Sequence, residues 1–99
     1  MIVLEEKISP DPTLFVEKRD GRRVIFDVDK IDKALHKAAE KVMDVTPLVE
    51  KRLNTLIERI VEEVHSRFPQ GVKIYEIQNI VEHELLEAKE YALAEEYIT

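Results

Sequence analysis

The sequence predicts an α+β domain in which a small β-sheet caps one end of a four-helix bundle. Three observations carry this prediction: an Asp-Gly turn between short apolar runs, four later segments with helical apolar spacing, and prolines at helix boundaries. The length of 99 residues suits one domain with one core. We assign residues 13–99 to this domain and residues 1–12 to a flexible leader, which Pro10 and Pro12 end.

A β-hairpin is expected over residues 13–26. Apolar residues at Phe15 and Val16, and again at 24–26, flank a charged stretch that contains Asp-Gly at positions 20 and 21. This dipeptide between apolar runs is a strong hairpin signal, because glycine adopts the positive φ that a tight turn requires. Residues 72–75 leave room for a short third strand.

Four helices are expected, near residues 28–43, 47–67, 75–87 and 91–98. The first has Asp27 as its N-cap and apolar residues at spacings of three and four. The second begins with Thr46 as N-cap and Pro47 at the first helical position, and the Pro-Gln-Gly at 69–71 ends it. The turn before the fourth helix contains neither glycine nor proline, so the third and fourth helices could also form one bent helix.

The composition excludes several classes of protein. No cysteine is present, which excludes a disulfide scaffold, a thiolate zinc site and a cysteine nucleophile. No apolar run approaches the roughly 20 residues of a membrane span. Glu5 and Glu6 interrupt the first apolar run, so we expect no signal peptide and a cytoplasmic location. Two glycines leave little room for a glycine-rich phosphate loop.

Catalytic patterns are poor. His36, His65 and His83 lie on three different predicted helices and form no metal-binding spacing, so exposed helical histidine is the ordinary interpretation of each. Ser9 and Ser66 have no nucleophile context. The sequence therefore predicts no enzyme.

Charge is unevenly distributed. The net charge of −6 argues against nucleic acid as a partner. Four of the six residues from Lys18 to Arg23 are nevertheless basic, and Lys30 follows in the first helical turn. Such a cluster, beside a helix N-terminus, suits the phosphates of a small anion. The alternatives are a charged turn that only protects a sheet edge, as in a ligand-free interaction module, and a nucleic-acid-binding hairpin.

The same residues resemble the ATP-cone family. Residues 16–31 read Val-Glu-Lys-Arg-Asp-Gly-Arg-Arg-Val-Ile-Phe-Asp-Val-Asp-Lys-Ile, which is similar to the family's opening motif. The Glu-Ile-Gln at 76–78, with Val81 and Glu82, and the Ala-Glu-Glu-Tyr-Ile at 94–98 are similar to its later segments. The resemblance covers about residues 14–99 and implies a domain that binds ATP or dATP, with Mg²⁺ on the phosphates, as an allosteric effector.

The resemblance also implies a set of site residues. Lys18 and Arg19 match the residues that meet the phosphates, and Gln78 matches a position near the sugar or triphosphate. The full set implied is Val16, Lys18, Arg19, Asp27, Lys30, Ile31 and Gln78. Ile74 stands where many members carry a hydroxyl residue, which puts that phosphate contact in doubt.

For the parent protein, the resemblance implies a ribonucleotide reductase large subunit from which this domain is excised, with the anaerobic class favoured. The chain stops at Thr99, where the family continues into further basic residues, so a phosphate contact from that tail is expected to be missing. A transcriptional repressor is disfavoured, because its cone follows a cysteine zinc ribbon. The partners implied are the nucleotide, the rest of the reductase chain, and a second copy in nucleotide-dependent association, with no membrane.

Overall fold

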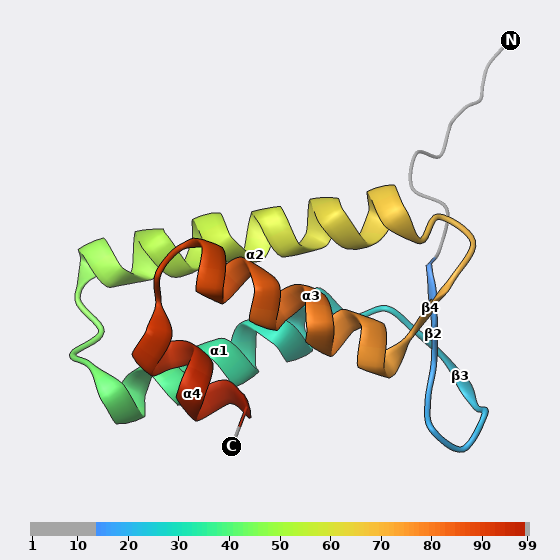
Figure 1. Cartoon of the computed structure of the whole chain (residues 1–99), viewed down its shortest axis with the longest axis horizontal. Helices are drawn as coiled ribbons and strands as arrows, with labels where there is room; N and C mark the ends of the chain where they lie inside the picture. Colours follow the sequence, from blue (N-terminus) through green and yellow to red (C-terminus); the bar gives the residue numbers. More distant parts are fainter. Residues whose placement is uncertain (1–13, 99) are drawn as a thin grey trace, which may run out of the picture.

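The computed structural model describes residues 14–98, and its architecture is α+β as the sequence predicts (Figure 1). In chain order the elements are β2 (Phe15–Glu17), β3 (Arg23–Ile25), α1 (Val28–Val42), α2 (Pro47–Arg67), β4 (Val72–Lys73), α3 (Ile74–Glu87) and α4 (Tyr91–Ile98). All four predicted helices are confirmed, each to about one residue at either end. The expected flexible leader, residues 1–12, lies outside the described residues.

Three short strands form one sheet in the order β3-β2-β4. Val16 of β2 lies opposite Val24 in the antiparallel pair with β3 and opposite Val72 in the parallel pair with β4. The third strand is therefore present, but it has only two residues. It ends there because the N–H of Lys73 donates to Oε1 of Glu76 at 3.0 Å, a capping contact that starts α3 at the next residue. The sheet caps one end of the helices, as predicted (Figure 1).

Aliphatic side chains from all four helices and the sheet form one core. α2 and α4 each pack against α1 and α3, so the helices form a closed ring (Figure 1). Within residues 14–98 no polar or charged residue is buried. The largest fully buried side chains are Leu35, Leu53, Ile60, Val64, Val81, Leu85 and Leu93.

The predicted helix starts are confirmed in atomic detail. A side-chain oxygen of Asp27 accepts a hydrogen bond from the N–H of Asp29 at 3.0 Å, which caps α1. The hydroxyl of Thr46 accepts from the N–H of Val49 at 3.2 Å, and Pro47 follows in the first turn of α2. Each cap satisfies a backbone donor that the helix itself leaves unpaired.

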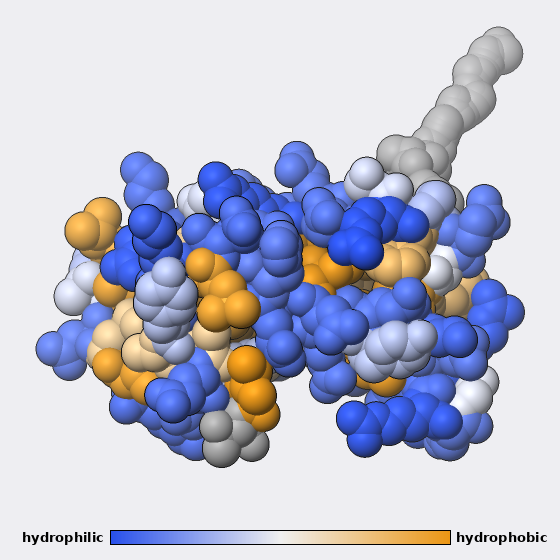
Figure 2. All heavy atoms as spheres, in the orientation of Figure 1, coloured by the Kyte–Doolittle hydropathy of each residue, from blue (hydrophilic) through white to orange (hydrophobic). Residues whose placement is uncertain are grey.

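The surface on the face shown in Figure 2 is mostly hydrophilic, and apolar side chains gather at the end that holds α4. The exposed large apolar residues there include Leu86, Tyr91 and Ile98. None of the helices within the described part of the chain is both long and apolar enough to cross a bilayer.

Helices α3 and α4 are separate, so the alternative of one bent helix is wrong. Lys89 takes the left-handed conformation at φ 61° and breaks the helical path. Its N–H donates to Leu86, and the N–H of Glu90 donates to Leu85, which is the Schellman pattern that ends many helices. The sequence left the bent-helix alternative open because lysine, not glycine, occupies the left-handed position.

Replacing Lys89 by glycine should stabilise the domain by about 1 kcal/mol, because glycine adopts a positive φ without the steric cost of a β-carbon. Lys89→Ala is the matched control, since it removes the same charge but keeps the β-carbon. Urea denaturation of both variants measures the difference. An equal effect of the two substitutions would show that the charge, not the backbone conformation, matters at this position.

Candidate functional site

The basic cluster surrounds the tip of the β2–β3 hairpin. The N–H of Lys18 donates to the carbonyl of Arg22 at 2.8 Å, and the N–H of Gly21 donates to the carbonyl of Lys18 at 2.9 Å. The loop between them therefore has three residues, Arg19 to Gly21, and Gly21 at φ 88° supplies the left-handed position such loops need. The predicted turn at Asp20-Gly21 is confirmed.

A hollow of about 340 Å³ lies between this hairpin tip and the first turns of α3. The residues that line it are Lys18, Arg19, Asp20, Arg22, Ile74 and Gln78. A neighbouring hollow of about 230 Å³ shares Lys18, Arg19 and Ile74 and adds Glu17, Lys73 and Tyr75. Three of the site residues implied by the sequence, Lys18, Arg19 and Gln78, thus line one surface, although 59 positions separate Arg19 from Gln78 along the chain.

The other four implied residues do not line this hollow. Val16 is buried within the sheet, only 4% exposed. Asp27, Lys30 and Ile31 lie at the start of α1, where Asp27 caps the helix and Ile31 is buried in the core. Of these four, Lys30 and Asp27 present exposed charged side chains.

Two hairpin residues were missing from the implied set, Asp20 and Arg22. Oδ2 of Asp20 accepts from Nε of Arg22 at 2.8 Å, and Oδ1 accepts from the N–H of Arg22 at 3.0 Å. The backbone N–H of Arg22, followed by its guanidinium, lowers the pKa of the Asp20 carboxyl. The signal in the sequence was the hairpin itself, because a three-residue loop places Lys18 opposite Arg22.

A larger hollow of about 590 Å³ lies between α2 and α3, but its chemistry does not suit a phosphate. Its lining includes four carboxylates, Glu62, Glu63, Glu84 and Glu87, against the single positive charge of Arg59. The hollow at the hairpin tip, lined by three cations and one paired carboxylate, is the better anion site.

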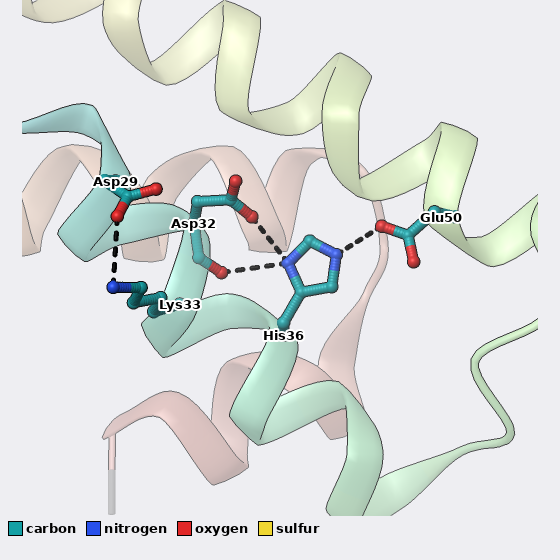
Figure 3. Close-up of polar contacts among 5 residues, drawn as sticks. All are labelled: Asp29, Asp32, Lys33, His36 and Glu50. Carbon is teal, nitrogen blue, oxygen red and sulfur yellow. Dashed lines mark hydrogen bonds and ion pairs between the residues drawn. The ribbon is translucent and has the colours of Figure 1, made fainter.

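A second polar cluster joins α1 to the start of α2 (Figure 3). Nδ1 of His36 lies 2.6 Å from Oδ1 of Asp32 and 2.9 Å from its carbonyl oxygen. Nε2 of His36 contacts Oε1 of Glu50 across the two helices. The hydrogen bond to Glu50, followed by the backbone carbonyl of Asp32, raises the pKa of His36 above its ordinary 6.5.

This cluster should make stability depend on pH. Because the pKa of His36 is raised in the folded state, its contribution is fully present below 6.5 and is lost as the pH rises through the raised pKa. His36→Gln should remove this pH dependence and cost about 1 kcal/mol at acidic pH, since the contacts are partly exposed. Urea denaturation at pH values below 6.5 and above the raised pKa of His36 measures this difference in the free energy of unfolding.

His83→Gln, at an exposed histidine of α3, is the control and should leave the pH dependence in place. If the His36 variant kept the pH dependence of the unaltered chain, another group would be its source.

A family profile described as the ATP cone domain matches residues 14–99, the whole of the described structure. The chain belongs to the ATP-cone family. ATP-cone domains bind ATP or dATP and act as allosteric regulators, which agrees with a cation-lined hollow. The resemblance stated from the sequence is confirmed.

Curated relatives of this ATP-cone domain fall into two kinds. The chain is 37% identical over 93 residues to the ribonucleoside-diphosphate reductase subunit alpha of Chlamydia muridarum, covering 87% of this chain and 9% of that protein. The same subunit of Chlamydia trachomatis is 38% identical over 93 residues, with the same two shares. The transcriptional repressor NrdR of Carboxydothermus hydrogenoformans is 37% identical over 82 residues, 83% of this chain and 51% of the repressor. The chain thus spans about a tenth of the reductases and half of the repressor.

Proposed function

We propose that this ATP-cone domain binds ATP or dATP at the hairpin hollow. The observation that carries the proposal is the convergence of Lys18 and Arg19 with Gln78 of α3 on one surface. Two cations next to an amide can hold a triphosphate without a glycine-rich loop, because guanidinium and ammonium groups supply charge-assisted hydrogen bonds.

The residues around α1 would meet the rest of the nucleotide. Lys30 adds positive charge, and Ile31 supports the helix start from the core. One oxygen of Asp27 accepts from Asp29, which leaves the other to accept from the adenine amino group or a sugar hydroxyl. Backbone contact from Val16 has the least support, since this residue lies opposite Val24 and Val72 on both sides of β2.

Mg²⁺ would accompany the nucleotide on its phosphate oxygens. Within residues 14–98 no group of three or more carboxylate or histidine side chains is placed to hold a metal ion. Asp20, the carboxylate at the hollow, already accepts from Arg22 with both oxygens. The phosphate oxygens of the nucleotide, which Mg²⁺ commonly coordinates, would therefore be its ligands in place of protein side chains.

The parent function that we propose is allosteric control of a ribonucleotide reductase. Similarity to reductase alpha subunits over 87% of the chain supports it. These relatives are diphosphate reductases, so the anaerobic class rests only on the Glu-Ile-Gln segment at 76–78. Control of a transcriptional repressor is the second candidate, and 37% identity to the NrdR protein favours it.

Calorimetric titration with ATP, dATP and GTP tests the binding. We expect ATP and dATP to bind the folded domain with measurable heat. GTP should bind more weakly if the site recognises the base. A chain that binds none of the three at millimolar concentration would contradict the proposal and favour a ligand-free interaction module.

We also propose that nucleotide governs self-association. The exposed apolar side chains of Leu86, Tyr91 and Ile98 provide a surface for it. Without nucleotide we expect a monomer or a weak dimer, and sedimentation with and without dATP measures the change. A tight dimer indifferent to nucleotide would contradict this coupling.

A further inference from the structure

The register of the hairpin directs two cations to the same side of the sheet. Lys18 and Arg22 lie directly opposite each other, since the N–H of Lys18 donates to the carbonyl of Arg22. Side chains alternate between faces along a strand, so Lys18 shares the face of Val16 and Arg22 the face of Val24. Val16 is buried against the helices, and both cations therefore lie on the bundle side, where they line the same hollow.

Asp20 holds the guanidinium of Arg22 but accepts from only one of the three guanidinium nitrogens. It accepts from Nε at 2.8 Å and from the backbone N–H at 3.0 Å. Among residues 14–98 no protein group accepts a hydrogen bond from the two terminal nitrogens of Arg22. The four N–H bonds on those nitrogens remain for an oxyanion, which a guanidinium fork matches well.

Like charges directly opposite each other in a β-ladder are unfavourable unless something lies between them. The α3 side of the hollow offers no cation, because its lining residues there are Ile74 and Gln78. An anion in the hollow would relieve the repulsion between Lys18 and Arg22 and would meet no charged side chain from α3. The positive charge for a phosphate must then come from the hairpin.

We infer that Arg22 is a third phosphate-binding residue of this site, held in position by its contact with Asp20. This inference rests on the proposed function, because it assigns a further contact to the same nucleotide. It adds a cation from the position after the Asp-Gly turn.

The neighbouring arginine provides a matched control. Arg23 lies on the opposite face of the sheet, with its guanidinium carbon 4.8 Å from the centre of the Phe15 ring. It does not line the hollow at the hairpin tip. Arg22→Ala and Arg23→Ala remove the same charge from the same strand region, so they share any long-range electrostatic effect and differ in contact with the ligand.

Calorimetric titration of the 99-residue chain and both variants with ATP, ADP and AMP tests the assignment. Arg22→Ala should weaken ATP binding by about tenfold or more, the effect of losing one charge-assisted contact. The loss should shrink from ATP to AMP as phosphates are removed. Arg23→Ala should bind ATP nearly as the unaltered chain does, and melting curves without nucleotide verify that all three chains fold.

Equal affinities of the two variants would overturn the role of Arg22 while leaving the proposed function intact, provided the unaltered chain binds ATP. An unaltered chain that binds no ATP would overturn both.

The positioning role of Asp20 has its own test, a double-mutant cycle with Asp20→Asn and Arg22→Ala. Asparagine can still accept from the N–H of Arg22, so the turn keeps its hydrogen bond. Removing the negative charge of Asp20 should by itself favour phosphate binding. Where Arg22 is present, however, the same substitution also releases its guanidinium. We therefore expect the effect of Asp20→Asn on ATP affinity to be less favourable when Arg22 is present than when it is replaced by alanine. Equal effects in both backgrounds would overturn the positioning role.

Discussion

Saturating ATP or dATP is expected to raise the melting temperature of the chain by on the order of 10 °C or more. A ligand that binds only the folded state stabilises it by about 2.7 kcal/mol at a hundredfold excess over Kd. For a domain of this size, about 1 kcal/mol corresponds to a shift of roughly 4–8 °C. Thermal unfolding followed by circular dichroism, with and without nucleotide, measures the shift.

The double variant Lys18→Ala with Arg19→Ala should abolish this shift. Both side chains line the hairpin hollow, and neither is buried, so the melting point without nucleotide should stay nearly unchanged. The matched control is Lys33→Ala with Lys37→Ala, which removes the same charge from α1 and should keep the shift. A shift that survives the hairpin variant would place the nucleotide elsewhere on the domain.

Leu93→Ala should destabilise the domain by about 2–5 kcal/mol, the range for a large aliphatic side chain removed from a core. Leu93 is 1% exposed and anchors α4, which has only eight residues. A helix this short is not stable in isolation, so its packing against α1 and α3 holds it in place.

Ile98→Ala is the control for Leu93→Ala, since it also shortens an aliphatic side chain of α4. Ile98 is 57% exposed, so its substitution should change the free energy of unfolding by less than about 0.5 kcal/mol. Urea denaturation of both variants compares them. Equal losses would show that α4 packs through a different face.

Most of the fold was predictable because its signals are local. Asp27 and Thr46 mark two helix starts through side-chain caps, and Asp-Gly at 20 and 21 marks the hairpin. The sequence left open whether α3 and α4 are one bent helix, because Lys89 takes a left-handed conformation that its residue type does not indicate. There the hydrogen bonds of the turn and the packing of α4 override the residue's own preference.

The hollow was only partly predictable. The charge of the hairpin predicted an anion site there, and the family resemblance assigned Lys18, Arg19 and Gln78 to it. Arg22 was overlooked as a site residue, because its role depends on which residue lies opposite Lys18, and that follows from the loop length. For Asp20, the sequence indicates only a turn residue, whereas the structure shows it as the partner of the Arg22 guanidinium.

The sequence by itself determined the order of the elements, the core-facing side of α1, α2 and α3 and the location of positive charge, because caps, periodicity and composition act over a few residues. Only the tertiary structure decided which distant residues share a surface. The two-residue strand β4 pairs with β2 and thereby sets the first two turns of α3, with Ile74 and Gln78, beside the hairpin tip. That juxtaposition depends on long-range strand pairing and core packing, which local sequence patterns do not encode.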